Sequence, residues 1–195
     1  MNSIGKRIAP FRVKAITGGT IRTMSDSDLL GSYTVLFFYP LDFTFVCPTE
    51  IHALQEKMSE FGARDVRIYA ISVDSIHAHR AWLEMPKERG GIAGVTFTLI
   101  SDINRQLALA FNVLNDEESV ALRGTFILDK ENVLQYASIN NLSFGRSIDE
   151  IIRVVDAISF IEKHGNQACP ANWSAGKKTM NQSAEGVIEY FTPSK

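Results

Sequence analysis

Apolar and polar positions follow strand-like and helix-like periods along the chain. Residues 34–39 and 66–73 are nearly continuous apolar runs, which predicts two strands buried on both faces of a sheet. Between them, apolar residues recur at helical spacing at 51, 54, 58 and 61, which predicts a core-facing helix over about residues 47–61 that ends at Gly62. The chain therefore begins its core with a strand, a helix and a second strand.

The rest of the pattern continues this alternation. We predict strands at 11–16, 21–24, 96–100, 120–128 and 133–139, and helices at 26–30, 75–84, 105–111, 147–163 and 183–191. Asp74 or Ser75 can cap the helix at 75–84, and Asp102 can cap the helix at 105–111. Such an order predicts an α/β sandwich with a mixed sheet, although the pattern alone leaves thioredoxin-like and flavodoxin-like sheets open.

Composition narrows the class of protein. The chain has 195 residues, of which 45% are hydrophobic, and its net charge is −2. One domain with an appended arm fits this length, and the charge argues against a nucleic-acid-binding protein. The first ten residues lack the apolar core of a signal peptide, and no apolar run is long enough to span a bilayer. We therefore expect a cytosolic protein with no membrane or nucleic-acid partner.

Cys47 lies where the apolar run 34–39 passes into the first helix. It is the N-cap if Pro48 is the first helical residue, or the third helical residue if Thr44 is the N-cap. In both cases the sulfur lies in the first turn, where free N–H groups stabilise an anion such as a thiolate. Thr44 is three positions before Cys47, so its hydroxyl can donate to the sulfur, and the Pro40 ring could shield the pocket from water. A buried structural cysteine remains the alternative.

Two further residues have an open interpretation. Arg123 lies in an apolar strand and needs a partner, which is either a carboxylate in a structural salt bridge or a Cys47 thiolate. Cys169 lies in a polar tail and is either incidental or functional. Trp173, in the same tail, indicates that the tail packs onto another surface.

The spacing of cysteines and histidines excludes some chemistry. Two cysteines and four histidines show no zinc-site spacing, and there is no C-x-x-C redox motif. We expect His77 and His79 to be ordinary surface or capping residues.

The segment Pro40-x-x-x-Thr44-x-x-Cys47 resembles the active-site signature of the peroxiredoxins. The longer string at 43–50, Phe-Thr-Phe-Val-Cys-Pro-Thr-Glu, resembles their typical two-cysteine branch, of the alkyl hydroperoxide reductase C type. The resemblance extends from about residue 8 to 191, including the segments 122–129, 145–147 and 168–173. It implies a thioredoxin-like fold, with a peroxidase domain at 1–164 and a C-terminal arm at 165–195.

The resemblance also implies a reaction. Cys47 would reduce hydrogen peroxide or an alkyl hydroperoxide, with Thr44, Arg123 and Pro40 around it, and would become a sulfenic acid. Cys169 of a partner subunit would resolve this acid as an intersubunit disulfide. The family implies a homodimer, a ring of five dimers that meet near residues 76–82, and a thioredoxin-like or flavoprotein reductant. It implies no metal, haem or flavin cofactor.

Two alternatives and one regulatory property accompany this hypothesis. The oligomer could act as a holdase chaperone, whereas a general thiol–disulfide oxidoreductase is disfavoured by the missing C-x-x-C. Tyr190 and Phe191 resemble the terminal pair of peroxiredoxins that are easily over-oxidised, but the accompanying loop, residues 90–94, has one extra residue. We expect intermediate to high sensitivity to over-oxidation.

Overall fold

The structure, a computed structural model, describes residues 3–192. These residues form two compact units, which divide between Ile148 and Asp149. The first unit contains the central sheet, and the second contains the C-terminal arm together with nearly all of the long helix before it. The predicted functional boundary after residue 164 stays a prediction.

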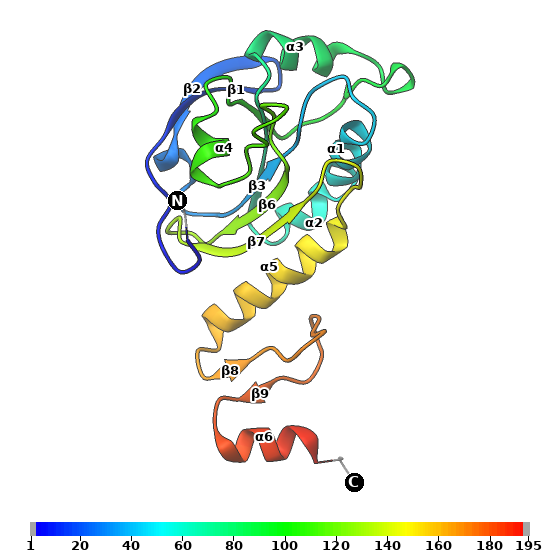
Figure 1. Cartoon of the computed structure of the whole chain (residues 1–195). Coiled ribbons are helices and arrows are strands. Elements are labelled where there is room, and N and C mark those ends of the chain that lie inside the picture. The colour runs from blue at the N-terminus through cyan, green and yellow to red at the C-terminus, as the bar shows by residue number, and fades with distance from the viewer. Residues whose placement is uncertain (1–2, 193–195) are drawn as a thin grey trace. The chain divides into compact units, whose positions relative to one another are not determined.

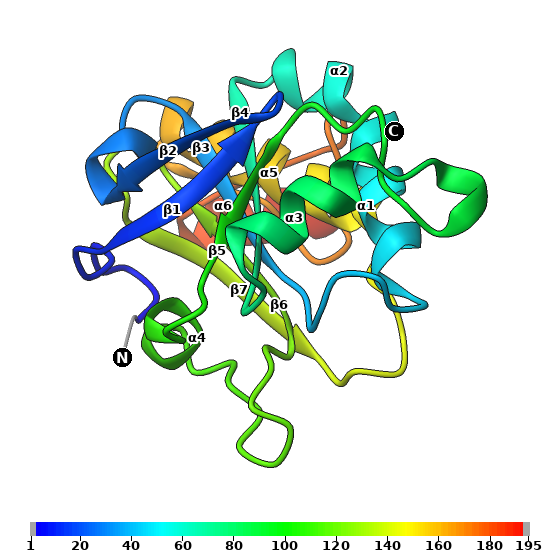
Figure 2. The same cartoon turned by 90° about the horizontal axis from the view of Figure 1, so that it is seen from above.

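Seven strands form the mixed sheet of the first unit (Figures 1 and 2). In spatial order they are β2 (Thr20–Ser25), β1 (Arg12–Thr17), β5 (Thr98–Ser101), β4 (Val66–Ser72), β3 (Tyr33–Phe38), β6 (Arg123–Leu128) and β7 (Leu134–Asn140). The three central strands β5, β4 and β3 are parallel, and every other pairing is antiparallel. The sheet confirms the predicted mixed α/β class, although β6 begins at Arg123 rather than at residue 120.

The helices largely follow the sequence pattern. They are η1 (Asp26–Leu29), α1 (Cys47–Glu56), α2 (Met58–Gly62), α3 (Ile76–Glu84), η2 (Lys87–Arg89), α4 (Gln106–Ala110), α5 (Ile148–Lys163) and α6 (Ala184–Phe191). Ser75 caps α3 by accepting a hydrogen bond from the Ala78 N–H at 3.2 Å. The predicted Ser75 cap is thus confirmed. Asp102 accepts from the first-turn N–H groups of Leu107 and Ala108 at 2.9 and 2.7 Å, but the N-cap residue of α4 is Arg105, so Asp102 bonds to this helix from outside the cap position.

The prediction of one helix over residues 47–61 was wrong. Lys57 interrupts it, with φ −97° and ψ 5°, and its N–H bonds to the Leu54 carbonyl at 3.1 Å in a tighter turn. A new helix begins at Met58. Leu54 and Phe61 are both fully buried on either side of the break, so the apolar stripe continues and the sequence pattern does not reveal the interruption.

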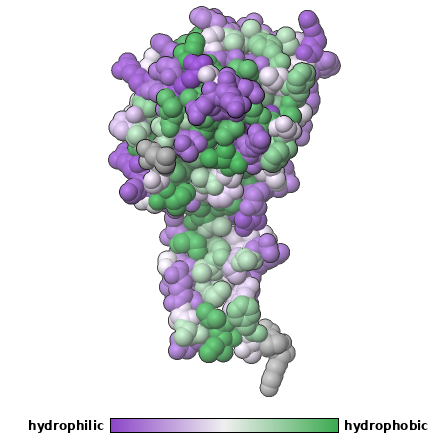
Figure 3. Space-filling view, viewed as in Figure 1, coloured by the Kyte–Doolittle hydropathy of each residue, from purple (hydrophilic) through white to green (hydrophobic). Residues whose placement is uncertain are grey.

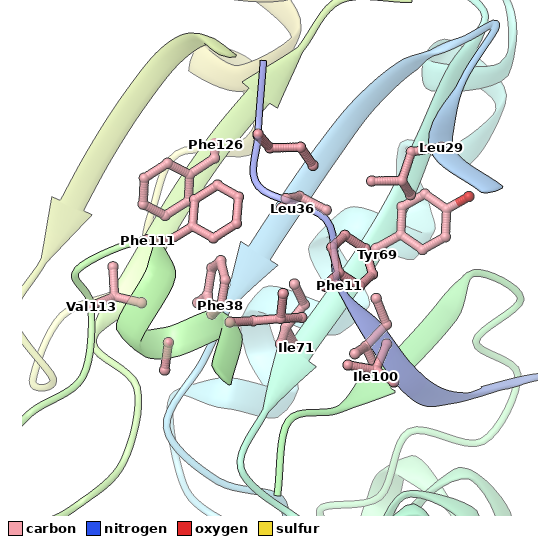
Figure 4. Close-up of a cluster of buried hydrophobic side chains, with 14 of the residues drawn as sticks. Phe11, Leu29, Leu36, Phe38, Tyr69, Ile71, Ile100, Phe111, Val113 and Phe126 are labelled. Carbon is pink, nitrogen blue, oxygen red and sulfur yellow. The ribbon is translucent and has the colours of Figure 1, made fainter. Parts of the chain in front are cut away.

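A cluster of apolar side chains fills one face of this sheet (Figure 4). Phe111, at the end of α4, packs against Phe38 of β3 and Phe126 of β6, with ring centroids 5.4 and 4.7 Å away. Because side chains alternate along a strand, Phe37 points to the opposite face. All six residues of β3 are buried, so the strand holds the start of the following loop in a fixed position.

The arm has its own small secondary structure. A two-stranded antiparallel ladder, β8 (Gln167–Ala168) and β9 (Met180–Asn181), precedes α6. The Ser183 hydroxyl caps α6 by accepting from the Gly186 N–H at 3.0 Å. The predicted helix at 183–191 is thus confirmed, whereas the ladder was not predicted, since its strands are only two residues long.

The end of the arm exposes apolar side chains. Val187, Ile188 and Phe191 of α6 are between 44% and 73% exposed, and Figure 3 shows a green patch among purple atoms near the end of the arm. No helix within residues 3–192 has both the length and the apolar character that crossing a membrane requires.

Candidate active site

Cys47 is the first residue of α1 and is fully buried. Val46 is the N-cap and Pro48 the second helical residue, so neither predicted register, N-cap or third position, is correct. Their shared consequence holds, because the sulfur still lies in the first helical turn. The N-terminal end of a helix carries unpaired N–H groups and a partial positive charge, which stabilise an anion there.

Thr44 approaches the sulfur as its spacing predicts. Its Oγ1 is 2.9 Å from Cys47 Sγ and also 2.9 Å from the Leu41 carbonyl oxygen. A hydroxyl has one proton to donate, and a thiolate can only accept. The Thr44 hydroxyl therefore donates to a thiolate, whereas a protonated Cys47 lets it turn to the Leu41 carbonyl. The hydroxyl proton can therefore reorient according to the charge on the sulfur, while the Thr44 oxygen stays in place.

Arg123 satisfies both open interpretations at once. Its Nη1 lies 3.4 Å from Cys47 Sγ and 2.7 Å from Glu50 Oε2, and its Nε donates to the Leu142 carbonyl at 2.8 Å. Only 4% of its side chain is exposed. The structural salt bridge and the contact to the sulfur thus share one guanidinium. Arg123 is the first residue of β6 rather than an interior one, so its side chain emerges at a strand end.

Glu50 and Arg146 complete the cluster, and the sequence reasoning did not single them out. Arg146 donates to Glu50 Oε1 from Nε at 2.8 Å and to Oε2 from Nη2 at 3.0 Å. The Arg146 Cζ also lies 3.3 Å from the centre of the Phe37 ring. Glu50 could have been found from its position, because it is three residues after Cys47 on the buried face of α1.

The charges of this cluster point to an anionic sulfur. Two guanidinium groups face one carboxylate, and all three side chains are less than 5% exposed. The buried charge sums to zero only when Cys47 carries a thiolate. Burial lowers the pKa of Arg146, and the hydrogen bonds and charge of Glu50 oppose that effect.

Gly124, next to Arg123, is required by its surroundings. A Cβ at this position would lie 2.7 Å from the Phe126 ring and 2.8 Å from Val113 Cγ1. Distances this short require the neighbours to move. The glycine therefore lets β6 pack tightly just where Arg123 turns toward the sulfur.

A buried network supports the loop that carries Thr44. The Tyr39 hydroxyl donates to Asp42 Oδ1 at 2.7 Å, and Asp42 Oδ2 is 2.7 Å from His79 Nδ1. His79 Nε2 is 3.1 Å from the Ile100 carbonyl, which can only accept, so Nε2 carries a proton. The loop is thus tied to β3, α3 and β5.

The prediction that His79 is a surface or capping residue was wrong, since its side chain is fully buried. His77 is exposed, as predicted. Two positions along a helix turn a side chain to the opposite side, and α3 directs the second of the two inward. Pro40 is also buried, directly after Tyr39, and its shielding role stays a prediction.

Asp74 also forms a hydrogen bond to the loop that carries Thr44. Its Oδ2 accepts from the Asp42 N–H at 2.8 Å and from the Ser72 hydroxyl at 2.7 Å. Burial, followed by the nearby charge of Asp42, raises the pKa of Asp74 above its ordinary value. This carboxyl group is therefore held where its ionised form is disfavoured.

Cys169 lies in the second unit, directly after β8, and is half-buried. Both cysteines are free thiols. Burial raises the pKa of Cys169, and the positive charge of Arg153 opposes this rise. Its pairing with Cys47 is treated below as a proposal. Within the described residues, no three His, Cys, Asp or Glu side chains are grouped so as to hold a metal ion.

The chain is similar in sequence and in fold to known proteins. Residues 4–137 match the AhpC/TSA family, and residues 157–192 match the C-terminal domain of 1-Cys peroxiredoxin. A thioredoxin peroxidase of Echinococcus granulosus is 43% identical, over 97% of both chains. A chloroplastic 2-Cys peroxiredoxin of Arabidopsis thaliana is 40% identical, over 97% of this chain and 71% of the relative. The crystal structure of reduced 2-Cys peroxiredoxin from Plasmodium vivax has a TM-score of 0.92 and 42% identity, covering 96% of this chain and 97% of that one.

The chain belongs to the AhpC/TSA family, as a 2-Cys peroxiredoxin. The resemblance inferred from the sequence is therefore confirmed, as is the thioredoxin-like fold with a mixed sheet flanked by helices. This peroxiredoxin is an oxidoreductase that reduces peroxides by thiol chemistry. The holdase alternative gains no support from these relatives.

Proposed function

We propose that Cys47 is the thiol that attacks the peroxide in this enzyme. The observation that supports the assignment is the pair of donors at its sulfur, the Thr44 hydroxyl at 2.9 Å and the Arg123 guanidinium at 3.4 Å. Both donors can hold a peroxide oxygen and stabilise the charge that develops on it. Pro40, which has no N–H and is buried beside Tyr39, would limit the access of water.

The proposed first step is a displacement on oxygen. The Cys47 thiolate attacks one peroxide oxygen, the S–O bond forms as the O–O bond breaks, and the alkoxide or hydroxide that leaves takes up a proton. The sulfur is oxidised by two electrons to a sulfenic acid and the peroxide is reduced to an alcohol or water. Thr44 and Arg123 orient the substrate, and Glu50 positions Arg123.

We assign the resolving role to Cys169 of a partner subunit. Its thiol would displace hydroxide from the Cys47 sulfenic acid, which forms an intersubunit disulfide and water. A two-fold homodimer would then contain two equivalent sites. Because Cys47 is fully buried, its first helical turn must open for the sulfurs to meet, and the segment that carries Cys169 must open as well.

An external dithiol would then reduce the disulfide. Thioredoxin-like proteins and a flavoprotein partner are the candidates, and the name of the thioredoxin peroxidase from E. granulosus favours the former. We further propose a ring of five dimers that meet around residues 76–82, a cytosolic location, and a division into a peroxidase domain, 1–164, and an arm, 165–195. Sizing the reduced protein by ultracentrifugation tests the ring.

Non-reducing electrophoresis tests the two cysteine roles. The reduced protein is treated with about one equivalent of hydrogen peroxide, and wild type is compared with Cys47→Ser and Cys169→Ser. We expect a covalent dimer in the wild type that both variants lack. A sulfenic-acid probe should label Cys47 in the Cys169→Ser variant.

Two results would contradict the assignment. A wild type that stays monomeric under denaturing conditions, while Cys47 is still labelled by the probe, would exclude Cys169 as the intersubunit resolving thiol. A Cys47 that is not labelled in any variant would exclude it as the attacking thiol.

A further inference from the structure

Arg153 of α5 is held by a carboxylate one turn earlier on the same helix. Its Nε and Nη2 donate to the two oxygens of Glu150 at 2.6 and 2.7 Å, which is a two-bond fork. Such a fork fixes the plane of the guanidinium and the direction of its third nitrogen. Both side chains are partly exposed, and an ion pair at such exposure adds little to the stability of the protein. The more important effect of the Glu150 contact is that it fixes the orientation of the Arg153 guanidinium.

The third nitrogen bonds to the segment that follows Cys169. Arg153 Nη1 donates to the Trp173 carbonyl at 2.9 Å. The Trp173 N–H closes a turn on the Pro170 carbonyl at 3.1 Å, with Asn172 in the left-handed region at φ 58°. Cys169 immediately precedes this turn, so the arginine holds the backbone four residues after the thiol.

The Trp173 side chain strengthens the same attachment. Its ring lies 5.2 Å from the ring of Phe160, also on α5, and its indole N–H donates to the Lys177 carbonyl at 3.0 Å. On the other side of Cys169, β8 pairs with β9 through only two residues. Cys169 thus lies between the short β8–β9 ladder and the contacts that hold Trp173 to α5. The charged hydrogen bond from Arg153 to the Trp173 carbonyl is one of these contacts.

We propose that Arg153 is a positioning residue for Cys169, which it serves by holding the segment 169–173 closed on α5. We call the set of Glu150, the Arg153 guanidinium and the Trp173 carbonyl the Arg153 clasp. The clasp keeps Cys169 in its half-buried place until the segment opens locally. Its kinetic consequence rests on the proposed resolving role of Cys169, but the restraint itself does not.

The clasp sets a competition between two fates of the oxidised enzyme. A Cys47 sulfenic acid is either captured by Cys169 or oxidised by a second peroxide to a sulfinic acid. A closed segment delays capture, so a stronger clasp favours over-oxidation and a weaker clasp favours the disulfide. Arg153 would act on this second step and leave the first reaction of Cys47 with peroxide unchanged.

The direct test is the rate at which an alkylating reagent labels Cys169 in the fully reduced enzyme, recorded across pH and compared at full ionisation of the thiol, because the Arg153 charge itself lowers the pKa of Cys169. We expect Arg153→Met to increase this rate about tenfold, which corresponds to about 1.4 kcal/mol in the opening equilibrium, because one charged hydrogen bond is removed. Glu150→Gln keeps the guanidinium and should cause a smaller increase. Arg153→Lys cannot reproduce the fork and should fall between wild type and Arg153→Met. Lys163→Met, at an exposed position of the same helix, is the matched control for loss of charge and should resemble wild type.

Hydrogen exchange and stopped-flow kinetics complete the test. In Arg153→Met, amides at 166–182 should exchange faster while those of β3 do not, disulfide formation should accelerate, and sulfinic acid at high peroxide should decrease.

Labelling of Cys169 at the wild-type rate or more slowly in Arg153→Met would overturn the proposal. If Arg153→Met loses protection throughout the sheet, Glu150→Gln decides, and an unchanged rate there overturns it. Because labelling needs no peroxide, it tests the clasp even if wild type forms no intersubunit disulfide.

Discussion

Arg123 and Glu50 form a 2.7 Å ion pair in which each side chain is at most 4% exposed, and the paired nitrogen also lies 3.4 Å from Cys47 Sγ. The carboxylate of Glu50 attracts the same guanidinium nitrogen that approaches the Cys47 sulfur. Glu50 therefore fixes the direction of the Arg123 guanidinium. The second guanidinium, of Arg146, compensates the negative charge that Glu50 adds. The sulfur thus faces a cation whose position is set before any peroxide binds.

Glu50→Gln should impair both stability and activity. Removing one partner of a buried ion pair leaves uncompensated charge, here on Arg123 and Arg146, and costs about 3–5 kcal/mol. We expect urea unfolding to show a loss of this size, and the rate of Cys47 oxidation by hydrogen peroxide to fall at least about tenfold.

Glu56→Gln is the matched control, since Glu56 lies on the same helix with a side chain 72% exposed and a 3.8 Å contact to Lys87. It should change stability by less than about 0.5 kcal/mol. Equal stability losses in the two variants would contradict the role of Glu50.

Thr44 should be needed for its hydroxyl rather than for its shape. Thr44→Val keeps the volume but removes the donor at 2.9 Å from Cys47 Sγ, and we expect about a 100-fold slower oxidation of Cys47. Thr44→Ser restores a hydroxyl and should recover most of the rate. Stopped-flow measurement of the first peroxide reaction checks this, and a valine variant as fast as the serine variant would refute it.

The raised pKa of Asp74 predicts a pH dependence of stability. Its folded-state pKa lies above its ordinary value of 3.8, so its contribution is complete below pH 3.8 and is lost as the pH rises through the raised value. Asp74→Asn does not titrate and can still accept both hydrogen bonds. Its free energy of unfolding relative to wild type should therefore increase as the pH rises from about 4 to 7.

Asp65 provides a control of opposite sign. Lys130 and Ser32 lower its pKa, so its contribution is present above pH 3.8 and is lost as the pH falls. Asp65→Asn should become less stable relative to wild type as the pH rises. Urea unfolding at several pH values measures both, and two parallel curves would contradict the assignment.

Gly124→Ala should destabilise the site, whereas Gly62→Ala should not. A methyl group at 124 meets Phe126 and Val113 at 2.7 and 2.8 Å, and overpacking of this kind costs about 1–3 kcal/mol. At Gly62, the last residue of α2, a Cβ meets nothing within 4 Å. Thermal unfolding of the two variants compares them, and a neutral Gly124→Ala would show that the neighbours can move aside.

The sequence predicted the strands of the central sheet, most helices and three of the contacting residues, because burial and periodicity are local properties. Cys47 and Thr44 are three positions apart, and this spacing predicted their contact, although Thr44 lies in the loop before α1 and not in its first turn. Arg123 was found because a charge in an apolar strand requires a partner. Its double contact, to the sulfur and to Glu50, could not be predicted, since it depends on how β6 is placed against α1.

The errors have the same origin. The break at Lys57 leaves the apolar stripe intact, so no periodicity reveals it. His79 was assigned to the surface because a histidine carries no pattern that marks burial. Its burial depends on Asp42 and the Ile100 carbonyl, which approach from other parts of the chain. The short ladder of β8 and β9 is below the length that alternation can detect.

The pairing of β3 with β6 has a consequence for protein engineering. Phe37 lies opposite Thr125, and Arg123 is two residues before Thr125, so the strand register sets the face from which Arg123 projects. A one-residue deletion at position 124 would turn Arg123 to the other face, away from Cys47. Grafting this chemistry onto another scaffold therefore requires copying two neighbouring antiparallel strands in register, and a transplanted cysteine loop alone would lack its cation.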